Sequence, residues 1–318
     1  MNDVTAISRP AEPDWSAITD ADLEVYVAAE NRFRASSAAR AFLGEPDANV
    51  AIAWQEVVLP GRKQLVRVYR PAMINPGRSG HAPLPLVLHV HGGGFVGTAV
   101  QCDWANSSIA AGLPAVVVSV EHRLLHRDMP LSAAAADGWD VLHHLSQHAA
   151  EWGVDASRIA IFGESCGALI GALTALRARA AGLRCRAQVL VNPVADVTET
   201  MFAYPSMTRY AYSPSRAMPL LRWLQRLAVP PGADAREVSP IHAEDLGGLP
   251  PALVVVPTED ALADHGRDYA ERLRAAGTSV RLTEYPGAQH AFLTLPGIEP
   301  QAEVARAEIL EFLRASLG

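Results

Sequence analysis

The sequence is poor in cysteine, has no excess of basic residues and contains no long apolar run. Its three cysteines, Cys102, Cys166 and Cys185, are too few and too scattered to predict a disulfide framework or a zinc site with paired ligands. We therefore expect reduced thiols, no bound metal and no cofactor.

The formal net charge of −7 argues against the basic surface that binding to nucleic acid or to an anionic membrane requires. The most hydrophobic stretch, residues 109–120, is interrupted by Gly112 and Pro114 and is shorter than the ~18 residues that span a bilayer. The N-terminal residues lack the basic region and the apolar region of a secretory signal. These absences predict a cytoplasmic protein that binds small or neutral molecules.

Short apolar runs, rich in Val, Leu and Ile, alternate with longer segments of helical composition. The runs cover residues 83–91, 115–122, 158–163, 187–193, 251–257 and 279–286. Nearly continuous apolar strands are typical of a mainly parallel sheet covered by helices on both faces, so the pattern predicts an α/β fold. Residues 49–71 form two alternating runs joined around Pro60 and Gly61, which predicts an antiparallel hairpin at the start of the sheet. A last helix from about Pro300 should pack on the sheet through one apolar face.

Two segments do not follow this alternation. Residues 1 to about 49 are polar and helical in composition, and residues 195 to about 240 form a long insertion rich in aromatic residues and Met. An insertion of this length in a compact domain is usually a lid or a binding element.

The stretch "RIAIFGESCGALIGAL", residues 158–173, places a glycine frame around a serine where a strand should pass into a helix. Gly163, Ser165 and Gly167 have the G-x-S-x-G spacing of a nucleophile on a sharp turn, where flanking glycines avoid Cβ clashes. The alternative is an ordinary glycine-rich turn with a capping serine. Cys166 is a weaker nucleophile candidate, because the motif centres on Ser165 and free cysteine is more often a small buried hydrophobe.

Residues 89–97, "HVHGGGFVG", follow a predicted strand. Consecutive glycines allow backbone N–H groups to converge on one point, as an oxyanion hole requires. We expect His89 and His91 to support the shape of this loop.

An acid and a base follow the serine in the order that this architecture uses. Glu259, Asp260 and Asp264 lie after one predicted strand, and His290 lies in a loop after the next. A histidine held by a carboxylate can take the proton of a serine hydroxyl, so these residues complete a candidate Ser-His-acid triad.

On "HGGGF", "GESCG", "TEDALADHG" and "YPGAQHAF", the chain resembles the hormone-sensitive-lipase-like carboxylesterases of the α/β-hydrolase fold, from about Val50 to the C-terminus. It is also similar to plant carboxylesterases through "SVEHRL". The resemblance implies that Ser165 is the nucleophile, His290 the base and Asp260 the acid. It also implies an oxyanion hole made by the N–H groups of three residues: Gly93, Gly94 and Cys166.

The resemblance further implies a helical cap over a catalytic core. Residues 1–49 and 195–240 would build the cap, and residues 50–194 and 241–318 the two parts of the core. Aromatic residues at the cap are either packing residues or a substrate pocket, and the pocket candidates are Phe95, Phe202, Tyr210 and Trp223.

Some residues depart from the pattern of the family. Its elbow is usually G-D-S-A-G-G, whereas this chain has Glu164, Cys166 and Ala168. His122 replaces a usual Tyr, and His265 stands where a Glu is common. We expect these departures to alter the contacts around the elbow and the substrate preference.

The leading hypothesis is a serine carboxylesterase that hydrolyses small or short-to-medium acyl esters through an acyl-enzyme intermediate. Its activity should fall on the acid side of a pKa near the ordinary histidine value of ~6.5. One alternative is an amide or thioester hydrolase, or an acyltransferase, with the same triad. Another is a non-catalytic small-molecule receptor, against which the retained serine and histidine argue. The oligomeric state stays open, with a homodimer among the alternatives.

Overall fold

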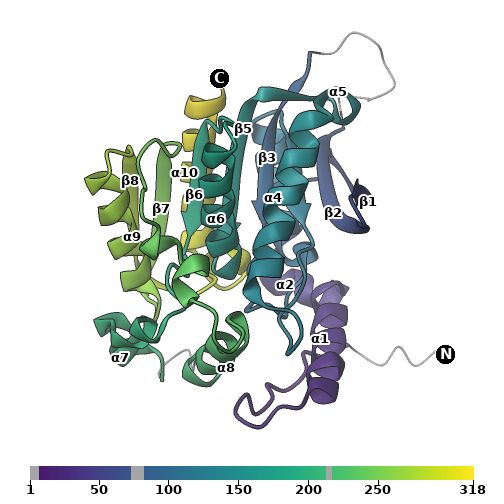
Figure 1. Cartoon of the computed structure of the whole chain (residues 1–318). Coiled ribbons are helices and arrows are strands. Elements are labelled where there is room, and N and C mark those ends of the chain that lie inside the picture. The colour runs from purple at the N-terminus through teal and green to yellow at the C-terminus, as the bar shows by residue number, and fades with distance from the viewer. Residues whose placement is uncertain (1–6, 73–81, 213–216) are drawn as a thin grey trace, which may run out of the picture.

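The computed structural model describes residues 7–72, 82–212 and 217–318, which form one central sheet with helices on both faces (Figure 1). Within these residues the sheet has eight strands in the order β1-β2-β4-β3-β5-β6-β7-β8. The strands are β1 (Val50–Leu59), β2 (Arg62–Pro71), β3 (Leu84–Val90), β4 (Val116–Val120), β5 (Val154–Glu164), β6 (Ala187–Val191), β7 (Ala252–Glu259) and β8 (Val280–Gln289).

The sheet is antiparallel at one edge and parallel elsewhere. The strands β1 and β2 form the predicted hairpin, and β2 also runs antiparallel to β4. All other neighbours, from β4 to β8, pair in parallel. The prediction of a mainly parallel α/β sheet is confirmed. Since the parallel strands all end at one edge, the loops that follow them meet there.

The central strands are buried on both faces because their side chains alternate between two apolar layers. In β3, Leu86 and Leu88 belong to one hydrophobic cluster, whereas Val87 belongs to the other. This explains why these strands are continuous apolar runs in the sequence.

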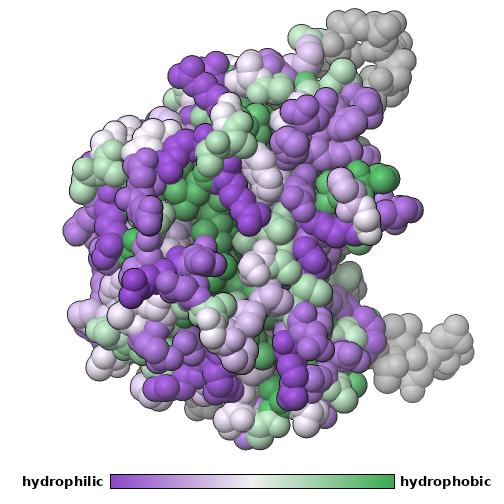
Figure 2. Space-filling view, viewed as in Figure 1, coloured by the Kyte–Doolittle hydropathy of each residue, from purple (hydrophilic) through white to green (hydrophobic). Residues whose placement is uncertain are grey.

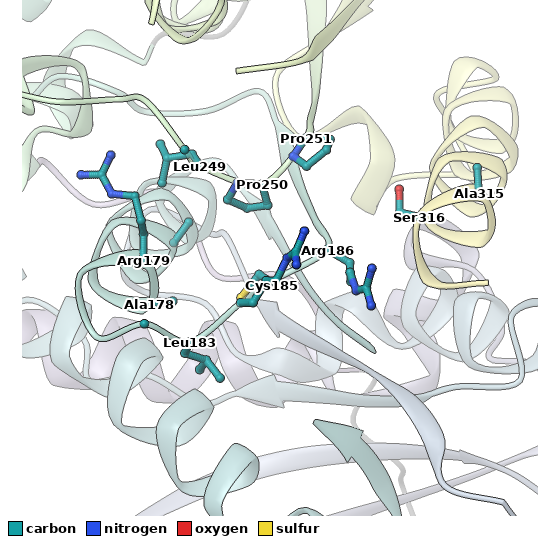
Figure 3. A pocket seen from close by; sticks show the side chains of 14 residues that line it. Ala178, Arg179, Leu183, Cys185, Arg186, Leu249, Pro250, Pro251, Ala315 and Ser316 are labelled. Carbon is teal, nitrogen blue, oxygen red and sulfur yellow. The ribbon is translucent and has the colours of Figure 1, made fainter. Parts of the chain in front are cut away.

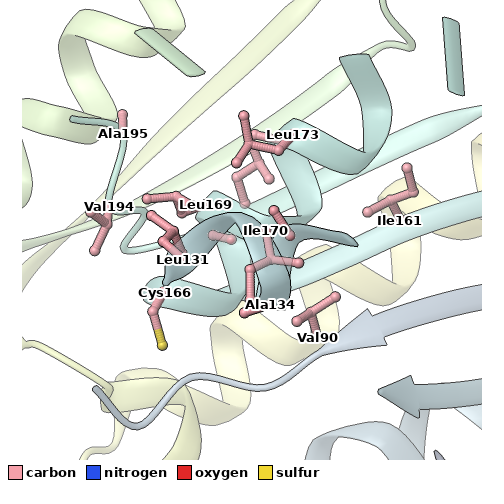
Figure 4. Close-up of a cluster of buried hydrophobic side chains, with 14 of the residues drawn as sticks. Val90, Leu131, Ala134, Ile161, Cys166, Leu169, Ile170, Leu173, Val194 and Ala195 are labelled. Carbon is pink, nitrogen blue, oxygen red and sulfur yellow. The ribbon is translucent and has the colours of Figure 1, made fainter. Parts of the chain in front are cut away.

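One layer contains α4 (Leu131–Gln147), α6 (Cys166–Ala180) and α9 (Ala263–Ala275), with the short α5 (Ala149–Trp152) beside it; the other contains α3 (Asp103–Gly112) and α10 (Gln301–Leu317). Figure 4 shows the first layer where α6 packs: Leu169, Ile170 and Leu173 lie among side chains of the strands and of α4. The final helix buries Ile309, Leu313 and Leu317, as its periodicity predicts.

The two segments outside the alternation gather at one end of the molecule, the lower end in Figure 1. Their helices are α1 (Asp20–Arg34), α2 (Arg40–Leu43), α7 (Pro205–Tyr210) and α8 (Met218–Ala228). Trp15, which precedes α1, packs against Trp223 of α8 with ring centroids 5.0 Å apart. The two segments are therefore joined, although about 200 residues separate them in the chain. The predicted division into cap and core parts remains a prediction.

Short 3₁₀ helices complete the connections: η1 (Ser37–Ala39), η2 (Ala99–Cys102), η3 (Glu199–Ala203), η4 (Ala235–Val238), η5 (Pro240–His242) and η6 (Phe292–Thr294). None of the helices in the described part of the chain has both the length and the apolar character needed to cross a bilayer. The face in Figure 2 is mostly hydrophilic, with apolar residues visible near its centre.

Candidate active site

The turn from β5 into α6 holds Ser165 in a strained backbone conformation, with φ 54° and ψ −120°. A Cβ atom on Gly163 would lie 2.4 Å from the carbonyl oxygen of Gly167, and one on Gly167 would lie 2.1 Å from that of Val90. Neither position can hold a side chain unless the backbone moves. The two glycines of the motif are thus required by close backbone contacts, and the strain at the serine, of order 1–3 kcal/mol, is typical of functional sites.

Ser165, His290 and Asp260 form a continuous chain of hydrogen bonds. Ser165 Oγ lies 2.8 Å from His290 Nε2, and His290 Nδ1 lies 2.8 Å from Asp260 Oδ2. Asp260 is buried after β7, and its Oδ1 accepts a hydrogen bond from the N–H of Leu262 at 2.9 Å. His290 follows β8, and its side chain is partly exposed.

The pKa of His290 lies above its ordinary value of 6.5. Burial by itself lowers it, but the negative charge of Asp260, the hydrogen bond to that carboxylate and the charge of Glu164 together outweigh the effect of burial. The imidazole is therefore a stronger base than a free histidine.

The glycine loop after β3 lies against the serine. A Cβ atom on Gly92 would be 3.3 Å from the Cβ of Ser165. Gly93 and Gly94 have φ values of 99° and 62°, a region that favours glycine. Cys166 is the first residue of α6, where the backbone N–H has no acceptor within the helix. Burial raises the pKa of its thiol to about 11, so the thiol is protonated at neutral pH and a poor nucleophile.

Two histidines support this loop. The rings of His91 and His122 stack with centroids 4.2 Å apart, and His122 Nε2 lies 3.2 Å from the carbonyl oxygen of His91. Burial lowers the pKa of His91 to about 3. Burial, followed by the charge of the neighbouring His91 ring, lowers the pKa of His122 to about 4. Both rings are neutral at physiological pH and act as packing groups. In place of the Tyr that is usual in the family, His122 thus contributes a ring stacked on His91.

Glu164 connects the serine turn to the histidine loop, a link that the sequence pattern did not reveal. Its Oε2 accepts a hydrogen bond from Thr294 Oγ1 at 2.9 Å, and Thr294 lies four residues after His290 in η6. Only the sequence neighbourhood of Ser165 hinted at this role.

A cavity of about 490 Å³ opens between α1, α2 and the loop that follows His290. It extends from Gly93 to Ala291, and its apolar side chains are Phe33, Phe42, Leu43, Leu295 and Ile298. Gly93 belongs to the glycine loop, and Ala291 directly follows His290. The cavity is therefore positioned to hold one side of a substrate.

Charged residues of α1 also line this cavity. Buried Glu30 accepts from Arg34 Nε at 3.0 Å and from Arg9 Nε at 3.2 Å. Arg34 also bonds to Gln101, and its Nη1 lies 2.9 Å from where a Cβ on Gly93 would stand. This arginine therefore packs an N-terminal helix directly against the glycine loop.

The four predicted pocket residues lie elsewhere than in this cavity. Phe95 is fully buried, with its ring edge-on to His122, and Trp223 packs against Trp15. Phe202 lies under the guanidinium of Arg222, and Tyr210 is in contact with Arg209. Their role in substrate binding remains a prediction.

Two other features lie apart from the serine. His265 is buried, and its Nδ1 accepts from the N–H of Ala195 at 3.3 Å, so it anchors the start of the insertion to α9. The pocket in Figure 3 lies at the opposite edge of the sheet, between the residues that precede β6 and β7 and the end of α10, with Arg179 and Arg186 on its walls.

Comparison with known proteins agrees with this geometry. A family model described as α/β hydrolase fold matches residues 87–294. The carboxylesterase NlhH of Mycobacterium tuberculosis is 34% identical over 261 residues, covering 79% of this chain and 78% of that protein. An ethyl acetate hydrolase of Pseudomonas putida is 31% identical over 259 residues, with 79% and 78% covered.

Solved structures of esterases are similar over nearly the whole chain. The ester hydrolase EH1AB1 from the metagenome of Lake Arreo, in complex with a bipyridine phosphonate derivative, superposes with a TM-score of 0.83 at 28% identity, covering 96% of this chain and 92% of that one. A hyperthermophilic esterase of the archaeon Pyrobaculum calidifontis gives 0.81 at 30% identity, with 94% and 95% covered.

Proposed function

The chain belongs to the α/β-hydrolase fold family and is a carboxylic ester hydrolase, and we propose that it works through Ser165, His290 and Asp260. The observation that carries the proposed mechanism is the unbroken chain of 2.8 Å contacts from the serine hydroxyl to the aspartate. Base-assisted attack by a serine requires this order of contacts, from the hydroxyl through the imidazole to the carboxylate.

In the acylation step, Ser165 Oγ attacks the ester carbonyl carbon while His290 Nε2 takes the hydroxyl proton. Asp260 keeps the imidazole oriented and stabilises the imidazolium that forms. His290 then gives the proton to the leaving alcohol as the C–O bond breaks, and Ser165 carries the acyl group.

The negative charge on the carbonyl oxygen would be held by the N–H groups of Gly93, Gly94 and Cys166. Such donors contribute roughly 3–4 kcal/mol each to acyl transfer. The support is positional: the glycine loop lies against Ser165, and the amide of Cys166 is at the N-terminus of α6, where the helix dipole favours negative charge.

In deacylation, His290 removes a proton from water, the water oxygen attacks the acyl carbon, and the released Ser165 recovers the proton. The partial exposure of His290 leaves room for that water.

We propose small or short-to-medium acyl esters as substrates. The apolar cavity beside Gly93 and Ala291 supports this size class, since about 490 Å³ lies in the lower half of the range for small-molecule sites. A cytoplasmic location and a homodimer are further proposals, and the three buried free cysteines are compatible with a reducing compartment.

The triad geometry favours catalysis over a receptor role, since a receptor has no need of an activated serine. Amide hydrolysis, thioester hydrolysis and acyl transfer would use the same atoms, and no feature of the described residues favours one of them over ester hydrolysis.

The proposal is tested with p-nitrophenyl esters of increasing acyl length and with a fluorophosphonate probe. Replacement of Ser165 by Ala should lower kcat by roughly 10⁶-fold, to background, and abolish labelling. The exposed Ser157 provides the matched control, and Ser157→Ala should keep full activity. Full activity in Ser165→Ala would contradict the assignment, and cleavage of anilides or thioesters in preference to esters would contradict the substrate class.

A further inference from the structure

Three side chains with metal-binding atoms meet beneath the serine turn. His89 lies in β3, Cys102 at the end of η2 and Glu164 at the end of β5. A ring nitrogen of His89, the Sγ of Cys102 and a carboxylate oxygen of Glu164 all lie within 4.8 Å of one another, and all three residues are buried.

Two of these atoms lack a hydrogen-bond partner among the described residues. They are His89 Nε2 and Glu164 Oε1, which face each other across 3.7 Å. A buried polar atom without a partner costs about 1–3 kcal/mol, more when it is charged. A bound group that contacts both atoms would remove this cost.

We propose that His89 Nε2, Cys102 Sγ and Glu164 Oε1 form a binding site for one Zn²⁺ ion next to the catalytic serine. Imidazole, thiolate and carboxylate are all zinc ligands, at about 2.0–2.3 Å. An imidazole nitrogen and a carboxylate oxygen on a tetrahedral ion at these bond lengths stand roughly 3.3–3.5 Å apart, so the 3.7 Å pair needs to close by only a few tenths of an ångström.

The charges of the site suit burial. As the ion binds, the Cys102 thiol releases its proton to solvent, and the resulting thiolate and the Glu164 carboxylate together neutralise the two positive charges. His89 enters as the neutral ring, and its other nitrogen, Nδ1, lies 2.8 Å from the hydroxyl of Ser119, which can fix the ring as metal-bound histidines require. The side-chain amide of Asn106 also contacts His89 Nδ1, through its Nδ2 at 3.1 Å. Rotation of this amide by about 180° would place its unpartnered Oδ1 against His89 Nδ1 instead.

The site joins segments that sequence spacing cannot connect. The sequence predicts no metal because Cys102 lacks a paired cysteine nearby. His89 and Glu164 come together only because β3 and β5 are neighbours in the sheet. His89 pairs with Phe162, which lies two residues before Glu164. Glu164 directly precedes Ser165 and accepts the hydrogen bond from Thr294, so a metal ion bound to its carboxylate would also shift these two contacts. We therefore expect occupancy to inhibit ester hydrolysis, and the inference rests on the proposed role of Ser165 only for this consequence.

Co²⁺ is the probe, because a cobalt–thiolate bond gives a charge-transfer absorption in the near ultraviolet that does not depend on activity. The chelator-treated enzyme should bind one equivalent of Co²⁺ with this band, and Zn²⁺ should displace it. The variant Cys102→Ser should lose the band, and His89→Gln should weaken Co²⁺ binding by at least about tenfold. Cys185→Ser is the matched control, because Cys185 is also a buried free thiol but lies in the distant pocket of Figure 3, and it should keep the band.

Absence of the band in the folded wild type, or its persistence in Cys102→Ser, would overturn the proposal and leave the space to a water molecule. If Cys102→Ser does not fold, the His89→Gln titration decides, and wild-type affinity in that variant would overturn the site. Ser165→Ala should bind Co²⁺ like the wild type, so failure of the esterase assignment and failure of the metal site are distinguishable.

Discussion

At the scale of single residues, the chemistry depends on the environment that each side chain receives. His290, His91 and His122 are the same residue type within one site, yet the pKa of the first is raised and those of the other two are lowered. Asp260 lies within hydrogen-bond distance of His290, at 2.8 Å, whereas the other two rings stack on each other and the nearby Glu121 Oε2 is 3.7 Å from His91 Nε2. One histidine is thereby suited to proton transfer, and the others stay neutral.

The raised pKa of His290 predicts the acid limb of the pH–rate profile. The base must be unprotonated to accept the serine proton, so kcat/KM should fall as the pH drops through the raised pKa, and the midpoint should lie above 6.5. The sequence alone suggested a midpoint near the ordinary value, because it did not reveal which charges contact the ring. Rates with a neutral ester between pH 5 and pH 9 measure the midpoint.

Replacement of Glu164 by Gln should move this midpoint to lower pH, since it removes one of the charges that raise the pKa of His290 while an amide oxygen can still accept from Thr294. The exposed Glu151 serves as a control, and Glu151→Gln should leave the profile unchanged. A wild-type midpoint below 6.5, or an unchanged midpoint in Glu164→Gln, would contradict the electrostatic argument.

At the scale of secondary-structure elements, the site depends on how closely α6 approaches β3. The missing side chain at Gly167 lets the helix start within contact of the carbonyl oxygens of Val90 and His91. That approach places the helix N-terminus, the serine and the glycine loop in one small volume. The G-x-S-x-G spacing is therefore a packing requirement between two elements as well as a local turn.

Substitution of Gly167 by Ala should destabilise the protein by about 3 kcal/mol or more, because its Cβ would lie 2.1 Å and 2.5 Å from two backbone oxygens that cannot move independently. Gly171 is the matched control in the same helix, where a Cβ would lie 3.3 Å from a side-chain methyl group of Ile161. There the gain in helix propensity, up to ~1 kcal/mol, offsets the contact, and Gly171→Ala should stay within about 1 kcal/mol of the wild type. Urea denaturation compares the two variants, and equal midpoints would refute the close-packing argument.

At the scale of the whole molecule, the N-terminal segment and the insertion at residues 195–240 pack on each other. Trp15 packs on Trp223 and, with ring centroids 5.5 Å apart, on Tyr26 of α1. All three belong to the same hydrophobic cluster as the strands of the central sheet. The N-terminal segment and the insertion should therefore unfold together with the core.

Replacement of Trp15 by Ala should cost about 3–5 kcal/mol, the usual loss for a buried tryptophan. It should also raise KM more than it lowers kcat, because α1 lines the cavity proposed for the substrate but carries no residue of the proposed triad. Trp54 on β1 is the control: it is 39% exposed, and Trp54→Ala should cost less than about 1 kcal/mol with KM unchanged. A Trp15→Ala enzyme with wild-type stability and KM would show that the two segments act independently of the core.

The sequence by itself determined the alternating α/β architecture, the hairpin at residues 50–71 and the order of nucleophile, acid and base along the chain. These features depend on consecutive residues, since strand burial, turn geometry and motif spacing act over a few positions. Local sequence pattern left Glu259, Asp260 and Asp264 open as the acid, and the resemblance to the family pointed to Asp260. The tertiary structure brings Asp260 to His290, whereas Asp264 bonds to Ser206 and Arg267.

The cavity of α1 and α2 and the cluster of His89, Cys102 and Glu164 also became visible only in three dimensions. Their members come from segments tens to hundreds of residues apart, and distances across such separations are set by how helices pack on the sheet. No local pattern in the sequence encodes them.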